Sequence, residues 1–171
     1  MQQFNWFAVC AIAALVPMIM GFIWYSKAVF GRSWMRANRF LDEDMKMSGG
    51  KMAMTFTLAY IFSYMIAMFV STIVIHQFTL GSIIANDRSD AARKWITDTM
   101  TTYGGNFRTF KHGAFHGTLA SIMFVLPIIS IISLFERRSW KYVLIHWGYW
   151  LVTLALMGGI ICQFTQLPGG N

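Results

Sequence analysis

The chain has 171 residues, of which 56% are hydrophobic and only 12% are charged. A soluble domain carries about 25% charged residues, so this composition argues against a soluble enzyme, a nucleic-acid-binding domain and a disordered chain. The net charge is +7, but the basic residues flank apolar segments, where they suit anionic lipid headgroups rather than nucleic acid. The sequence therefore predicts an integral membrane protein.

Four apolar segments are long enough to cross a bilayer, which takes about 20 residues. They cover residues 4–25, 53–75, 113–135 and 142–162, and none contains Asp, Glu, Lys or Arg. Because a segment in lipid must satisfy its own backbone polar groups, each is predicted to be a helix. No basic residue precedes the first segment, so we expect a retained span rather than a cleaved signal. The predicted fold is all-α, a polytopic membrane protein with one four-helix transmembrane domain over residues 1–171.

The distribution of Lys and Arg predicts the orientation. The loops at 26–52 and 136–141 together carry nine of these residues, whereas the long loop between the second and third spans carries five. By the positive-inside rule, we expect the first and third loops in the cytoplasm and both termini outside. The predicted location is the inner cell membrane.

Two of the loops have patterns of their own. Apolar residues recur at steps of three or four between Phe30 and Met45, with Arg32, Arg36 and Arg39 on another face, which predicts an amphipathic helix lying in the headgroup plane. The second loop, residues 79–111, is too long for an unstructured connection and predicts a small cap on the outer face. Within it we expect a short helix with Ser89 as its N-cap, an Asp90–Lys94 pair one turn apart, and a stop at Gly104-Gly105.

Small residues within the spans predict where helices pack. In lipid, small side chains let helix backbones approach closely. The predicted packing positions, beginning with a four-residue repeat that also includes Thr55, are Ala59, Ser63, Ala67, Ser71, Gly113, Gly117, Gly148, Ala155 and Gly159. Pro17 and Pro127 each remove a backbone donor near the middle of a span and are expected to kink it.

Aromatic and basic residues at the ends of the spans predict contacts with lipid headgroups and the membrane interface. These residues are Trp24, Tyr25, Arg32, Trp34, Arg36, Arg39, Arg137, Arg138 and Trp140. Ser139 is expected to cap the fourth span, because it stands just before the first residues of that helix. Both cysteines, Cys10 and Cys162, fall within spans and are expected to be free thiols, since they form no metal-binding spacing.

Residues 21–34, GFIWYSKAVFGRSW, resemble a family known only as domain of unknown function 1761. Its members are small four-span membrane proteins whose first span ends in Trp-Tyr-Ser, followed by a Phe-Gly-Lys/Arg-x-Trp step. The segment 135–160 is similar to the last hairpin of that family. The family usually has Pro after Trp-Tyr-Ser, where this chain has Lys27. The resemblance implies the four-span architecture and no established activity.

Histidines form the only cluster of side chains that suggests chemistry. His112 and His116 are four residues apart on one helix face, and His76 is expected at a similar depth at the end of the second span. Three imidazoles at one level suit a metal ion, and two from different helices suit a haem. The alternative, which the sequence favours, is wet and unliganded histidines with no cofactor. His146 stands alone and is expected to make a hydrogen bond between helices.

No nucleophile–base pair or nucleotide-binding motif is visible, so we do not expect an enzyme. A proton-coupled transporter needs a carboxylate within the membrane, and the four predicted spans contain none. We therefore expect an accessory or structural subunit that acts through helix packing and lipid or partner contacts, either as a homo-oligomer or within a larger complex. The histidine-ligated metal or haem protein is the alternative, followed by a small transporter.

Overall fold

The first span lies over residues Trp6–Trp24 and is broken in its middle. The computed structural model, which describes residues 3–41 and 43–167, divides it into α1 (Trp6–Ala13) and α2 (Val16–Trp24). The side chain of Asn5 caps α1 by accepting a hydrogen bond from the backbone N–H of Phe7. Pro17 lies in the first turn of α2, where its missing N–H is tolerated. The kink expected at this proline is thus a break between two helices.

Three further spans complete the bundle. The second is α4 (Gly49–Val74), and the fourth is α9 (Trp140–Phe164). The third combines α7 (Phe110–Ala120), a π-helical turn η1 (Ser121–Val125) and α8 (Leu126–Phe135), so that the irregular turn ends two residues before Pro127. All four are long and apolar enough to cross a membrane, and the described residues form no strand, which confirms the predicted fold class.

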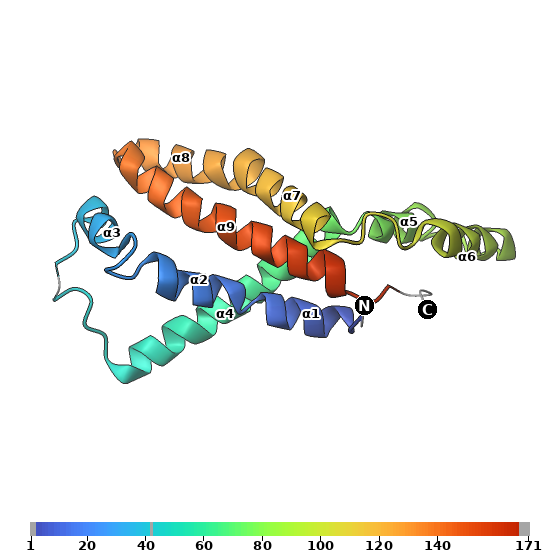
Figure 1. Cartoon of the computed structure of the whole chain (residues 1–171), viewed down its shortest axis with the longest axis horizontal. Helices are drawn as coiled ribbons and strands as arrows, with labels where there is room; N and C mark the ends of the chain where they lie inside the picture. Colours follow the sequence, from blue (N-terminus) through green and yellow to red (C-terminus); the bar gives the residue numbers. More distant parts are fainter. Residues whose placement is uncertain (1–2, 42, 168–171) are drawn as a thin grey trace.

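The four spans converge at one end of the bundle, where residues 4, 75, 110 and 164 lie; we call it the termini end. There, α9 runs between the α7–α8 helix and the α1–α2 helix, and α4 crosses the group obliquely (Figure 1). The core of this end includes Cys10, Ala67, Met157 and Ile161, whose side chains are fully buried. Away from it, α4 diverges from the other spans, and its residues 49–58 are exposed.

The amphipathic helix of the first loop is shorter than the sequence predicts. It is α3 (Gly31–Asn38), and it ends because Arg39 adopts a left-handed conformation with φ of 61°. Leu41 and Met45, expected on its apolar face, lie beyond the helix and are exposed. Gly31 is required by close approach, since a Cβ there would lie 2.6 Å from the Ser26 carbonyl oxygen.

The second loop forms a helical extension beyond the termini end, made of α5 (Gln77–Ile83) and α6 (Asp90–Tyr103) (Figure 1). The hydroxyl of Ser89 caps α6 by accepting from the N–H of Ala92, as predicted. The expected Asp90–Lys94 pair is wrong, because Lys94 reaches forward one turn to Asp98, with 2.6 Å between Nζ and Oδ2. At the opposite end of the bundle, Ser139 caps α9 as expected.

Candidate metal centre

His76 owes its position to the point at which α4 stops. The helix ends at Val74, and Ile75 is extended, with φ of −112° and ψ of 91°, and fully buried. The chain therefore turns at the boundary of the core, and His76 becomes the N-cap residue of α5. Its imidazole is exposed at the termini end of the bundle.

His112 and His116 lie one turn apart in the first half of α7. The start of this helix is fixed by two hydrogen bonds: the Thr109 hydroxyl accepts from the N–H of His112, and the Gln163 side chain accepts from the N–H of Phe110 at 3.1 Å. Both imidazoles are half-buried. A helical spacing of four places them on the same face, and this face is turned towards the end of α4.

The three histidines meet at this point. The Nε2 atoms of His76 and His112 are 3.0 Å apart. The centroid of the His116 ring lies 4.8 Å from the ring centroid of His76 and 4.5 Å from that of His112. One ring nitrogen from each residue lies within 4.8 Å of the other two. Nitrogens that bind one tetrahedral zinc ion at 2.0–2.1 Å are separated by about 3.3 Å, so the 3.0 Å between His76 and His112 is already close to the separation of two zinc ligands.

The packing of α7 against α9 holds two of these histidines in place. A Cβ on Gly113 would lie 2.7 Å from the carbonyl carbon of Gly158, and one on Gly117 would lie 2.6 Å from that of Leu154. Glycine is therefore needed at both positions, because only it permits backbones to approach so closely. Ala155 lies beside the second contact, as the sequence predicts, whereas Gly158 was not identified.

Hydrogen bonds join the remaining segments around the histidines. The Gln77 amide donates to the carbonyl oxygens of Gly104 and Asn106, at 3.1 and 2.9 Å, and so ties the start of α5 to the loop before α7. The Cys162 thiol lies 3.3 Å from the Val74 carbonyl oxygen and 3.4 Å from that of Phe107. The end of α4, the loop before α7 and the end of α9 are thus connected through Cys162, which lies beside Gly113, the neighbour of His112.

This arrangement has the chemistry of a metal site with an open position. The group of possible ligands consists of three imidazoles, without a carboxylate or a thiol among its described members. Neutral imidazole suits zinc, copper, iron and nickel ions. Three protein ligands leave a fourth position on a tetrahedral ion for water or another molecule.

The other predicted packing residues lie along the bundle as follows. In α4, Ser63, Ala67 and Ser71 are buried, whereas Ala59 is half-buried and Thr55 is exposed because α4 diverges there. Gly148 and Gly159 each face an aromatic ring, from Trp24 and from Phe110 respectively.

Two predicted interface residues are instead engaged with α9. Trp24 donates its indole N–H to the Ile145 carbonyl oxygen at 3.0 Å, and the Tyr25 hydroxyl lies 3.1 Å from Nδ1 of His146. This contact bears out the hydrogen bond between helices expected for His146.

The remaining predicted interface residues surround this region. The Trp34 ring packs on that of Tyr25, with 5.2 Å between centroids. Arg138 lies between Glu136, at 3.2 Å, and the Tyr142 ring. The exposed members of the set are Arg32, Arg36, Arg39, Arg137, Arg138 and Trp140.

Comparison with known protein families gives one match. A family model described as "Protein of unknown function (DUF1761)" matches residues 8–162, which include the second and third spans, nearly all of the first and fourth, and the three histidines. Comparisons with curated proteins and with solved structures gave no match. The match agrees with the resemblance of residues 21–34, and the chain therefore belongs to the DUF1761 family, whose function is unknown.

Proposed function

We propose that the protein is a small membrane protein that binds one divalent transition-metal ion, zinc above others, through His76, His112 and His116. The observation that carries the proposal is the convergence of three imidazoles from two separate helical segments, with a nitrogen of each within 4.8 Å of the others. The sequence alone favours unliganded histidines, because no acidic or cysteine ligand near them completes a cofactor site, and spacing along a chain does not measure a distance between helices. The folded arrangement supplies that distance.

The geometry favours an ion over haem. A porphyrin must lie between its two axial imidazoles, and Nε2 atoms 3.0 Å apart in direct contact leave no layer for it. A single ion, by contrast, replaces the hydrogen bond between His76 and His112 and draws in His116. The hydrogen bonds of Gln77 and Cys162 restrict the movement of the segments that carry the histidines, which lowers the free-energy cost of assembling the ligands.

A second role is favoured by the divergence of α4. Residues 49–58 are left uncovered, although Thr55 among them belongs to the repeat of small residues. Such a surface suits another helix in the membrane. We therefore propose, as a second candidate, an accessory or structural subunit that associates with a copy of itself or with another membrane protein. In this account, the exposed arginines of α3 bind anionic headgroups on the cytoplasmic side, and both termini lie outside.

The metal proposal is tested by zinc titration of the full chain in mild detergent, purified through a tag that contains no histidine. One equivalent of zinc is expected to bind the unmodified protein. His112→Ala and His116→Ala are each expected to bind zinc at least about tenfold more weakly. Removing a residue that only hydrogen-bonds a metal ligand already costs about 10–100-fold in metal affinity, and removing the ligand itself costs more. His146→Gln is the matched control, since this histidine lies at the other end of α9. Equal zinc binding by all four proteins, or none by any, contradicts the proposal.

A further inference from the structure

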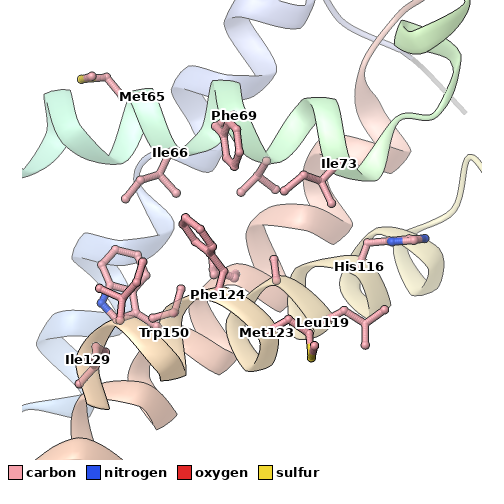
Figure 2. Close-up of a pocket in the computed structure, with 15 residues that line it drawn as sticks. Met65, Ile66, Phe69, Ile73, His116, Leu119, Met123, Phe124, Ile129 and Trp150 are labelled. Carbon is pink, nitrogen blue, oxygen red and sulfur yellow. The ribbon is translucent and has the colours of Figure 1, made fainter. Parts of the chain in front are cut away.

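An apolar groove begins at the histidine cluster. It lies between α4 and the α7–η1–α8 helix, with α9 as its floor, and its volume is about 780 Å³. Figure 2 shows Phe69 and Ile73 on the α4 side, Phe124 projecting from η1 towards them, and His116 at one end. The volume lies in the range of sites for small molecules, about 300–1,000 Å³.

The groove carries its titratable side chain at one end, and the indole of Trp150 is the other lining side chain with a polar atom. His116 is the only lining residue with a titratable side chain, and the others carry hydrocarbon, thioether or aromatic groups. Along α7–η1–α8, the lining runs from His116 to Ile129, which corresponds to about 20 Å at 1.5 Å per residue. One leaflet of a bilayer has a hydrocarbon depth of about 15 Å. The groove is therefore long enough for the chain of a membrane lipid.

Its walls are open to the surrounding bilayer. Phe69 and Phe124 line the groove from opposite sides, yet their side chains are 61% and 62% exposed. The π-helical turn contributes three consecutive lining residues, Met123 to Val125. Such turns occur frequently at functional sites, and this one widens the helix where it faces α4. A molecule dissolved in the bilayer can thus enter from the side.

The charge of the cluster selects the headgroup. Three neutral imidazoles leave the full positive charge on a bound divalent ion, and the group contains no carboxylate to balance it. Lys111, next to His112, is exposed and adds a cation at the same end. A carboxylate oxygen is a regular fourth ligand of zinc, at about 2.0–2.2 Å.

We infer that the groove and the histidine cluster form one site for a long-chain fatty acid, a class of ligand with one chain and one carboxylate. The chain lies in the groove, and the carboxylate takes the open position of the metal ion held by His76, His112 and His116. This inference rests on the metal site proposed above. It is a binding site, and no bond of the fatty acid is broken in it.

The test is binding of radiolabelled oleate to the full chain in detergent, with zinc content measured on the same samples. Zinc-loaded protein is expected to bind about one oleate per chain, and zinc-free protein at least about tenfold more weakly. Methyl oleate has the same chain without the charge and is also expected to bind at least about tenfold more weakly.

Variants separate the groove from the metal site. Ala120→Trp and Ile73→Trp, one on each wall, fill the groove and are expected to weaken oleate binding about tenfold while zinc content stays the same. Ala8→Trp places the same side chain at an exposed position of α1 outside the groove and is expected to bind oleate normally. Retained zinc also shows that each variant is folded.

The outcomes distinguish the two proposals. If zinc binds but the groove-filling variants bind oleate as tightly as the unmodified protein, the fatty-acid site is wrong and the metal site stands. The same conclusion follows if zinc binds but methyl oleate binds as tightly as oleate. If no zinc binds and oleate is held equally well without it, the metal site is wrong and the fatty-acid inference fails with it.

Discussion

Replacing Gly117 with Ala tests the contact that positions the two histidines of α7. The added Cβ would lie 2.6 Å from the carbonyl carbon of Leu154 and 3.1 Å from the Cα of Ala155, both backbone atoms that cannot turn aside. An ordinary van der Waals contact begins at 3.4 Å. The two helices must therefore separate, and the packing above and below Gly117 is disturbed with them.

The expected cost follows from this separation. Inserting a methyl group into a well-packed core costs about 1–3 kcal/mol when side chains can adjust. Here the obstacle is backbone, so we expect Gly117→Ala to lower the free energy of unfolding by at least about 2 kcal/mol. Since α7 carries His112 and His116, zinc affinity is expected to fall as well.

The assay is reversible unfolding of the purified protein in mixed micelles, followed by circular dichroism. Gly21→Ala is the matched control, because this glycine is also within a span and a Cβ there meets nothing within 4 Å. Alanine is the better helix former, by about 1 kcal/mol, so this variant is expected to be neutral or stabilised. Equal stability of the two variants would refute the close α7–α9 contact.

Two other predictions concern α4 and the orientation. Ser71→Ala removes the acceptor of the Trp6 indole N–H, 3.0 Å away, and is expected to destabilise the protein by about 1–3 kcal/mol; Thr72→Ala, at an exposed position of the same helix, should change the same unfolding curve much less. Labelling of single cysteines introduced at Trp95 and Arg36 is expected to place the first outside and the second in the cytoplasm, and the reverse result would overturn the predicted orientation.

The spans and helix caps could be predicted from sequence because each depends on local chemistry. A run of about 20 apolar residues has only one stable backbone arrangement in lipid. Ser89 and Ser139 are short polar side chains placed directly before a helical segment, and both cap as expected. Pro17 likewise removes a donor wherever the chain goes, and the first span is broken beside it.

Other features depend on tertiary contacts that a single sequence does not specify. The early end of α3 at Arg39 follows from a left-handed residue that the apolar periodicity does not reveal. Gly158, which the spacing of small residues does not single out, packs against Gly113, and the neighbouring Gly159 packs against the Phe110 ring. The positions of the three histidines relative to the ends of the spans predict a similar depth in the membrane. The distances between them depend on the packing of the bundle and on the turn at Ile75.

The central claim is that His76, His112 and His116 bind a metal ion, and X-ray absorption at the zinc edge tests it most directly. The full chain, purified through a histidine-free tag and loaded with one equivalent of zinc, is expected to show three imidazole nitrogens at about 2.0–2.1 Å and one oxygen. The imidazole signal is expected to weaken in His112→Ala. A shell of oxygens alone, a sulfur shell at about 2.3 Å, or a spectrum unchanged in that variant would contradict the account.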